Sequence, residues 1–329
     1  MKLIWHSPTR IGLKEIAGKL PASIELVPIT DDDELKRHID DAEIAMVGHH
    51  AYLRSAAEIY KARAKKLRWM QFRSAGIDTS VPLGLPKGPI VTYAPGMSAH
   101  PIAEHVMGMA LTFNRRFHEW RDIQQTHTWD RAEAVYGKMG CLAEQTMVVI
   151  GYGHIGQVLC QQAKGFGMRT IVVSRAARTG PTVDKVYTRD KLDEALTQGD
   201  VVAMCTALST ENYRMMGRAQ FARMKRSAYY INVSRGQLND EDALIEACRD
   251  GIIAGAGLDA TDTEPLPSSS PLWGLKNVLI TPHTSGRGSR DNERFAELMV
   301  ENVTRFLAGK ELKYVAGPEQ FNAPGKAHG

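Results

Sequence analysis

The stretch TMVVIGYGHIGQVLCQQAKGFG, residues 146–167, decides how the chain folds. Residues 146–150 form a continuous apolar run, as in a strand that is covered on both faces. Glycines follow, and then a helix-like stretch whose apolar residues share one face: Ile155, Val158, Leu159 and Phe166. The order strand, glycine turn, helix predicts the opening unit of an α/β domain with a parallel sheet.

The glycine turn reads Gly151-Tyr152-Gly153-His154-Ile155-Gly156 and has the spacing GxGxxG. We expect Gly151 to allow the tight turn, Gly153 to let a pyrophosphate approach the backbone, and Gly156 to let helix and strand pack closely. The backbone N–H groups at the helix start, around His154 and Ile155, would hold the phosphate charge. A lone GxGxxG also occurs as a purely structural turn, but the strand before it and the helix after it favour dinucleotide binding.

The next strand ends in IVVSRAAR, residues 171–178, where this motif usually places an acidic residue that binds the adenosine ribose. Here the positions hold Ser174 and Arg175, with Arg178 close behind. A hydroxyl and two guanidinium groups suit a 2′-phosphate, so we predict a preference for NADP(H), with NAD(H) possible. The alternative is that these are surface arginines beside a permissive NAD site.

Short apolar runs alternate with helix-like stretches along the whole chain of 329 residues. Before residue 95 they are KLIW, IELVPI, AEIAMVG, LRWMQF and IVTYA, and after residue 145 they are TMVVI, TIVVS, DVVAMCT, AYYINVS, AGAGLDA and NVLITPH. Between the two sets lies a helix, residues 101–113, that is apolar almost all round and must be buried or shared with another subunit. The pattern predicts two α/β domains with parallel sheets.

Composition excludes several classes of protein. With 43% hydrophobic and 24% charged residues and a net charge of +4, the chain has no electrostatic footprint for nucleic acid. It has no apolar run long enough for a membrane span and no signal peptide at its start, so we expect a cytoplasmic protein. The four cysteines are scattered and favour neither a disulfide framework nor a metal site.

Further motifs appear in a fixed order: SAGIDTS, APGMSAHPIAEH, LSTENYRMMGRAQFARMKRSAYYINVSRG, GLDATDTEPLP and TPHTSG. With them, residues from about 140 to 310 resemble the D-isomer-specific 2-hydroxyacid dehydrogenases, including their glyoxylate/hydroxypyruvate reductases. The resemblance is much weaker before residue 70. It implies two Rossmann/flavodoxin-like domains with the active site in the cleft between them. The substrate domain would be residues 1–97 plus 287–329, and the dinucleotide domain residues 98–286.

A homodimer would form on the helix 101–113 and the segment after it, because so much apolar surface is rarely exposed.

The resemblance places catalysis on Arg235, Glu264 and His283. The chemistry is consistent: reduction of a small 2-keto acid needs a proton donor for the forming alkoxide and a cation that holds the carboxylate and polarises the ketone. His283 can donate the proton near neutral pH, and Glu264 would favour its imidazolium form and fix the ring. Arg235 would act as an electrostatic clamp on the substrate. Taken singly, each residue also has a purely structural interpretation.

The resemblance also implies binding residues. Ser74, Ala75 and Gly76 would bind the substrate carboxylate through backbone N–H groups, together with Arg235 and His283. Asp259 would face the nicotinamide carboxamide, and Thr206, Val233 and Arg235 would line the cofactor groove. Tyr93 departs from the family pattern, in which Asn is common before a similar APG turn.

Other functions on the same fold remain open. Phosphite dehydrogenases carry Lys where this chain has Ala75, and formate dehydrogenases carry Gln where it has Glu264, so both are disfavoured. A nucleotide-sensing binding protein, like the dehydrogenase-like corepressors, retains such a triad and is an alternative from another class. His49 and His50 lie in a segment that contacts substrate in relatives and would favour a small polar acid such as glyoxylate or hydroxypyruvate; simple solvation is the alternative.

Overall fold

The chain divides into two compact units. The computed structural model describes residues 1–48, 50–129 and 131–321. One unit combines Met1–Ser98 with Gly288–Gly329, and the other is the continuous stretch Ala99–Arg287. We refer to them as the first and the second unit.

The first unit is built on a five-stranded sheet whose paired strands are all parallel. The strand order is β2-β1-β3-β4-β5, with β1 (Lys2–His6), β2 (Glu25–Ile29), β3 (Ile44–Val47), β4 (Trp69–Phe72) and β5 (Ile90–Thr92). These strands coincide with the apolar runs before residue 95, which confirms the prediction of a small parallel sheet.

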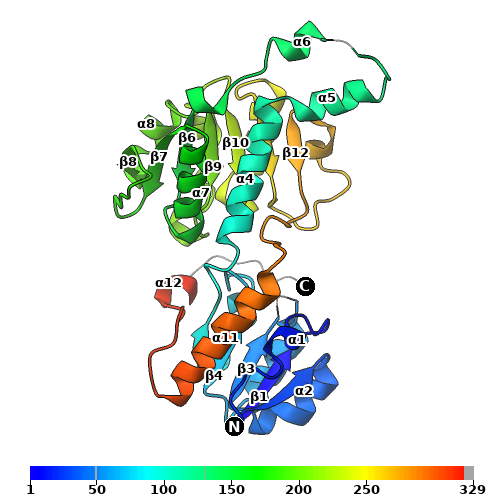
Figure 1. Ribbon diagram of the computed structural model, residues 1–329, viewed down its shortest axis with the longest axis vertical. Coiled ribbons are helices and arrows are strands. Elements are labelled where there is room, and N and C mark those ends of the chain that lie inside the picture. Colours follow the sequence, from blue (N-terminus) through cyan, green and yellow to red (C-terminus); the bar gives the residue numbers. More distant parts are fainter. Residues whose placement is uncertain (49, 130, 322–329) are drawn as a thin grey trace. The chain divides into compact units, whose positions relative to one another are not determined.

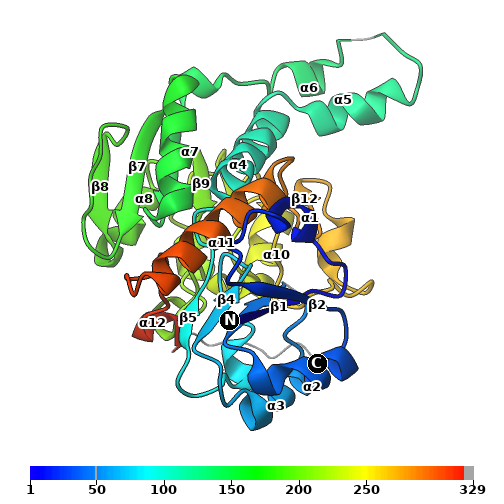
Figure 2. The same cartoon turned by 60° about the horizontal axis from the view of Figure 1, so that its bottom comes forward.

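Helices cover both faces of this sheet, as Figure 2 shows. On one face lie α2 (Asp32–His38) and α3 (Arg54–Arg63), and on the other lie α1 (Leu13–Ile16) and α11 (Asp291–Leu307). Alternate residues of β1 serve the two layers: Ile4 packs with Tyr60 of α3, whereas Trp5 packs edge-on against Phe295 of α11. The chain after residue 287 therefore completes the core of the first unit, and the last element of the described residues is α12 (Pro318–Phe321).

The second unit contains a seven-stranded parallel sheet of order β12-β11-β10-β9-β6-β7-β8. Its strands are β6 (Thr146–Ile150), β7 (Arg169–Ser174), β8 (Lys185–Thr188), β9 (Val201–Met204), β10 (Tyr229–Asn232), β11 (Gly255–Leu258) and β12 (Val278–Ile280). Six of them match the predicted apolar runs. The edge strand β8, KVYT, was not predicted because it is short and half polar.

The helices of the second unit also form two layers. In Figure 1, α4 (Ala99–Asn114) and α7 (His154–Gly165) cover one face of the sheet. The other face packs against α8 (Leu192–Leu196), α9 (Arg218–Phe221) and α10 (Glu241–Arg249). The strand order runs outward from β6 in both directions, which creates a topological switch point between β6 and β9. In open parallel sheets, ligands bind beyond the carboxyl ends of the strands at such a point.

The apolar helix is buried, which is one of the two outcomes that its sequence allowed. The apolar side chains of α4, among them Val106, Met109 and Phe113, are buried inside the second unit against α7 and the sheet. Exposed apolar side chains occur in the segment that follows, which contains α5 (Phe117–Gln124) and α6 (Glu133–Tyr136) and extends away from the sheet in Figure 1. We call residues 115–139 the arm. Phe117 is 56% and Trp129 is 102% exposed, and no residue of α5 is buried.

Three sequence expectations concern cysteines, metals and membranes. Cys160, Cys205 and Cys248 are buried, Cys141 is exposed, and all four are free thiols. Within residues 1–48, 50–129 and 131–321, no group of His, Cys, Asp and Glu is arranged to hold a metal ion. In the same ranges, no helix combines the length and the apolar character needed to cross a bilayer.

Candidate active site

The glycine turn between β6 and α7 depends on its glycines for steric reasons. Gly151 has φ +106°, and a Cβ atom there would lie 2.8 Å from the backbone of Cys205 and Thr206 at the end of β9. A Cβ atom at Gly156 would lie 2.1 Å from the Gly151 carbonyl oxygen. Gly153, the N-cap of α7, supplies no side-chain cap, and a Cβ atom there would meet nothing within 4 Å. The turn thus packs tightly against the sheet and leaves open space at the N-terminus of α7, where backbone N–H groups favour an anion.

The Ser174 loop lies beside this turn. The N–H group of Gly151 donates to the Val173 carbonyl at 2.8 Å, which joins the glycine turn to the end of β7. The Ser174 hydroxyl is buried and has no hydrogen-bond partner among the described residues. Arg175 and Arg178 are exposed. A buried hydroxyl without a partner, next to two cationic side chains, fits a ligand that brings acceptor oxygens, as a phosphate does.

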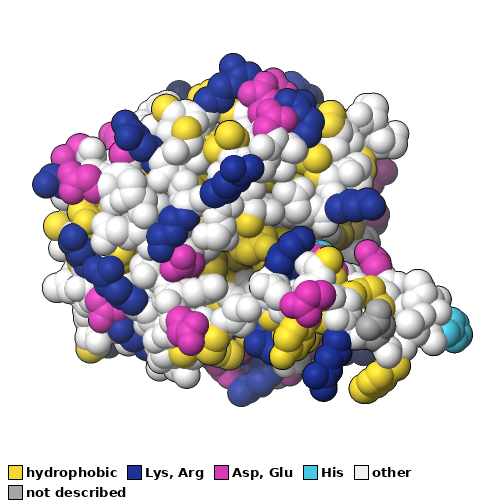
Figure 3. Space-filling model, turned by 90° about the horizontal axis from the view of Figure 1, so that it is seen from above, with side chains coloured by type: hydrophobic (Ala, Val, Ile, Leu, Met, Phe, Trp, Pro, Cys, Tyr) yellow, Lys and Arg dark blue, Asp and Glu magenta, His cyan; other side chains and the backbone are white. Residues whose placement is uncertain are grey.

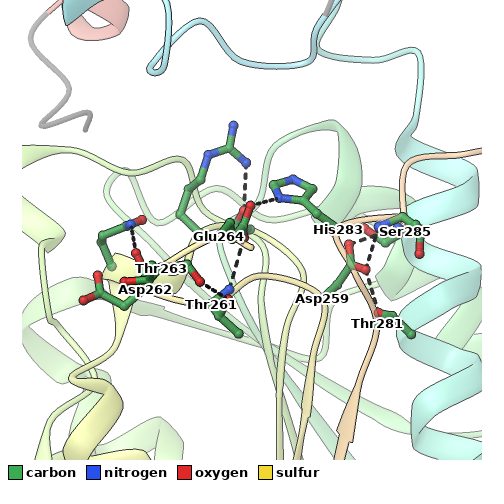
Figure 4. Close-up of polar contacts among 12 residues, drawn as sticks. Asp259, Thr261, Asp262, Thr263, Glu264, Thr281, His283 and Ser285 are labelled. Carbon is green, nitrogen blue, oxygen red and sulfur yellow. Dashed lines mark hydrogen bonds and ion pairs between the residues drawn. The ribbon is translucent and has the colours of Figure 1, made fainter. Parts of the chain in front are cut away.

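His283 and Glu264, two of the residues predicted to be catalytic, form a hydrogen-bonded pair. His283 Nδ1 lies 2.7 Å from Glu264 Oε2, and Glu264 Oε1 accepts from the Thr261 N–H at 3.1 Å (Figure 4). Partial burial of the carboxyl opposes its ionisation. The hydrogen bond and charge of His283, the Thr261 N–H and the charge of Arg235 outweigh that burial and hold the pKa of Glu264 below its usual value. Glu264 is therefore a carboxylate anion that holds the imidazole of His283 in a fixed orientation.

Arg235 is brought toward this pair by a tight turn after β10. Its N–H₂ group donates to the Ser234 carbonyl at 2.8 Å, and the Asn232 side chain donates to the Arg235 carbonyl at 2.8 Å. At the next position, Gly236, a Cβ atom would lie 2.0 Å from the Thr261 backbone. Only glycine lets this turn lie directly against the segment that leads to Glu264. The influence of Arg235 on the Glu264 pKa shows that the three predicted catalytic residues are gathered in one place.

Asp259 anchors the turn that carries His283. Its carboxylate is 1% exposed and accepts from the Thr281 hydroxyl at 2.6 Å, the Thr284 N–H at 2.8 Å and the Ser285 N–H at 2.9 Å. Its carbonyl also accepts from the His283 N–H at 3.0 Å. These contacts hold His283 at φ +51°, a left-handed conformation that costs a residue with a Cβ atom about 1 kcal/mol or more. Figure 4 shows Asp259 pointing toward Thr281 and Ser285, so the hydrogen bonds of this carboxylate stabilise the turn within the protein.

The remaining predicted cofactor residues lie at the carboxyl ends of neighbouring strands. Thr206 follows β9, and its backbone N would lie 2.8 Å from a Cβ atom at Gly151, so it borders the glycine turn. Val233 follows β10 and is 5% exposed. Two polar contributors were missed by sequence reasoning: Thr261, which orients Glu264, and His105 of α4, whose Nε2 lies 3.0 Å from the Thr281 hydroxyl. Both residues lie in quoted motifs, APGMSAHPIAEH and GLDATDTEPLP, but the motifs do not indicate these contacts.

The predicted substrate loop, Ser74–Gly76, belongs to the first unit and follows β4. The Ser74 carbonyl accepts from the Ala94 N–H at 2.9 Å, and Ala75 is exposed. His50 is an exposed residue after β3, whereas His49 lies outside the described residues. The structure therefore places this loop at the carboxyl end of a parallel strand, the edge where α/β sheets bind ligands.

Comparisons with known proteins agree with this geometry. Residues 107–285 match the family model described as D-isomer specific 2-hydroxyacid dehydrogenase, NAD binding domain. The chain is 32% identical over 256 residues to a glyoxylate reductase of Korarchaeum cryptofilum, covering 77% of each protein. Among solved structures, a D-isomer specific 2-hydroxyacid dehydrogenase family protein of Aeromonas salmonicida is 28% identical, with a TM-score of 0.84 over 96% of this chain and 98% of that one. A D-isomer specific 2-hydroxyacid dehydrogenase of Xanthobacter autotrophicus, solved with NADPH and MES, is 26% identical, with a TM-score of 0.81 over 97% and 99% of the two chains.

The chain belongs to the D-isomer specific 2-hydroxyacid dehydrogenase family. It is an NAD(P)-dependent oxidoreductase with two parallel-sheet α/β domains. The resemblance predicted from the sequence motifs is confirmed.

Proposed function

We propose that this enzyme reduces a small 2-keto acid to the D-2-hydroxy acid and prefers NADPH as its reductant. The observation that carries the proposal is the contact of 2.7 Å between His283 Nδ1 and the ionised Glu264, in a cluster that also holds Arg235. An imidazole that is oriented by a protein carboxylate can protonate the alkoxide that forms from the keto acid, and a nearby cation can bind the carboxylate of the same substrate.

Each residue of the cluster has a separate task. Glu264 binds Nδ1–H, so that Nε2 of the imidazolium is the atom that donates a proton to the carbonyl oxygen as it becomes an alkoxide. Arg235 binds the substrate carboxylate and draws charge toward the ketone oxygen. NADPH, when bound at the glycine turn, supplies the hydride. In the reverse reaction His283 acts as the base that takes the hydroxyl proton.

The preference for NADPH rests on the Ser174 loop. The unpartnered Ser174 hydroxyl donates to the 2′-phosphate, and Arg175 and Arg178 add positive charge to the same site. The absence of a carboxylate at the end of β7 removes the group that would repel this phosphate. The relative from Xanthobacter autotrophicus, whose structure contains NADPH, supports this assignment.

The first unit would bind the substrate through Ser74, Ala75 and Gly76, whose backbone N–H groups would hold the carboxylate. Asp259 would face the nicotinamide carboxamide in addition to its contacts with the His283 turn. Glyoxylate and hydroxypyruvate are the proposed substrates, and the name of the Korarchaeum relative, a glyoxylate reductase, supports the former.

The enzyme would act as a homodimer. Of the two elements expected at the interface, α4 buries its apolar side chains within the second unit. The exposed aromatic side chains of the arm, Phe117, Trp129 and Tyr136, are instead the surface that a second copy would cover.

A panel of 2-keto acids tests the proposed function. The purified enzyme is mixed with NADPH or NADH and with glyoxylate, hydroxypyruvate, pyruvate or buffer alone, and the loss of the reduced cofactor is followed. We expect turnover with a small keto acid and a higher kcat/KM for NADPH than for NADH. Binding of NADPH without turnover on any acid would favour the nucleotide-sensing alternative.

A further inference from the structure

A chain of hydrogen bonds leads from α4 to the turn that carries His283. We propose that His105, on α4, is a positioning residue of the active site, which acts on His283 through Thr281 and Asp259. His105 Nε2 lies 3.0 Å from Thr281 Oγ1, and Thr281 Oγ1 lies 2.6 Å from Asp259 Oδ1. The catalytic consequence of this relay rests on the proposed function.

The donor of each hydrogen bond in the relay follows from which groups carry a proton. The Asp259 carboxylate can only accept, and it does so from the Thr284 and Ser285 N–H groups as well as from Thr281. Thr281 has one hydroxyl proton, which it gives to Asp259. The Thr281 oxygen is therefore an acceptor toward His105, and His105 Nε2 must carry a proton.

The bond from His105 to Thr281 needs only that Nε2 carries a proton. His105 Nε2 also lies 3.9 Å from Asp259 Oδ1, which places its N–H dipole close to a carboxylate that is 1% exposed. Because linked hydrogen bonds polarise one another, donation by His105 strengthens the bond from Thr281 to Asp259.

The relay bears on catalysis because Asp259 holds His283 in an unfavourable backbone conformation. His283 has φ +51° and is tied to the Asp259 carbonyl by its own N–H group, while its two following residues are tied to the Asp259 carboxylate. If the Thr281 contact weakens, Asp259 Oδ1 loses one of the hydrogen bonds that hold its carboxylate in place. We expect the imidazole to sample orientations away from Glu264, which lowers the fraction of enzyme ready to donate a proton.

Three variants of His105 test the proposal in the full-length enzyme. His105→Phe keeps a ring but removes the donor; His105→Gln places an amide N–H near the position of Nε2; His105→Asn offers the same amide on a shorter side chain. Because a hydrogen bond of this kind contributes about 0.5 to 1.5 kcal/mol, kcat should fall about 2-fold to about 10-fold in His105→Phe and His105→Asn. His105→Gln should restore kcat to within about 2-fold of the parent. The dissociation constant of NADPH should stay within about 2-fold in all three.

A double-mutant cycle with Thr281→Val separates a relay from two independent contributions. If His105 acts through Thr281, the double variant His105→Phe/Thr281→Val should have the kcat of Thr281→Val alone. Multiplied losses would overturn the relay. Parental kcat in His105→Phe, or a lower melting temperature with unchanged kcat, would show that His105 has only a structural role.

A measurement that does not need activity tests the same assignment. Long-range ¹H–¹⁵N NMR spectra of the parent, with the His105 signals assigned from their loss in His105→Gln, report which ring nitrogen carries the proton at mildly alkaline pH. The relay predicts Nε2–H, and a proton on Nδ1 with bare Nε2 would overturn it. If the parent reduces no keto acid, the proposed function fails, and these spectra still decide whether the relay exists.

Discussion

Replacing Glu264 with Gln should lower kcat for keto-acid reduction. The variant keeps the shape of the side chain but removes the negative charge that lies 2.7 Å from His283 Nδ1. Hydrogen bonds to charged groups contribute about 1.5 to 3 kcal/mol, and the lower figure applies because the two side chains are 38% and 28% exposed. About 1.4 kcal/mol corresponds to a factor of ten in rate, so kcat should fall about 10-fold.

The loss is expected because the carboxylate orients the imidazole that donates the proton and balances its positive charge. The assay is kcat for glyoxylate or hydroxypyruvate with NADPH. Glu246→Gln is the matched control, because it removes a carboxylate that pairs with Arg218 on the surface. An unchanged kcat in Glu264→Gln, or an equal loss in the control, would refute the coupling.

Three other predictions follow from the same structure. Arg175→Ala should raise KM for NADPH about 10-fold or more with little change for NADH, and Ser174→Asp should depress the use of NADPH further; equal losses with both cofactors would contradict a 2′-phosphate site. Burial lowers the pKa of His6 from 6.5 to about 4, so the unfolded chain takes up a proton first as pH falls. Stability should therefore drop through this window by up to about 3 kcal/mol more in the parent than in His6→Asn, as urea unfolding would measure. Light scattering should give the mass of a dimer, and Phe117→Asp in the arm should shift it toward the monomer; a monomeric parent would contradict the interface.

The strands were predictable because parallel sheets covered on both faces leave continuous apolar runs in the sequence. Five runs became β1–β5, and six more became strands of the second sheet. The strand β8 escaped because an edge strand with one buried residue, Tyr187, carries little of this signal. The glycine turn was predictable for a different reason: Gly151 and Gly156 stand where a Cβ atom has no room.

The partners of the site residues could not be predicted in the same way. Arg235, Glu264 and His283 were found through motifs, but the contact between the last two is a consequence of strand order, which brings chain segments 19 residues apart together. The sequence left two possibilities open for α4, because an apolar sequence does not say whether a helix is covered by its own domain or by a second copy; the structure shows it covered by its own domain. His105 is the last residue of the motif APGMSAHPIAEH, but the motif does not indicate its partner, and the contact with Thr281 is visible only in the folded chain.

The central claim is that His283 is the proton donor in the reduction of a 2-keto acid, and His283→Ala tests it most directly. The measurement is kcat for the best acid of the panel with NADPH, together with the dissociation constant of NADPH for the same preparation. The account predicts a fall in kcat of about 100-fold to about 10,000-fold with cofactor binding little changed. A variant that kept near-parental kcat would contradict it.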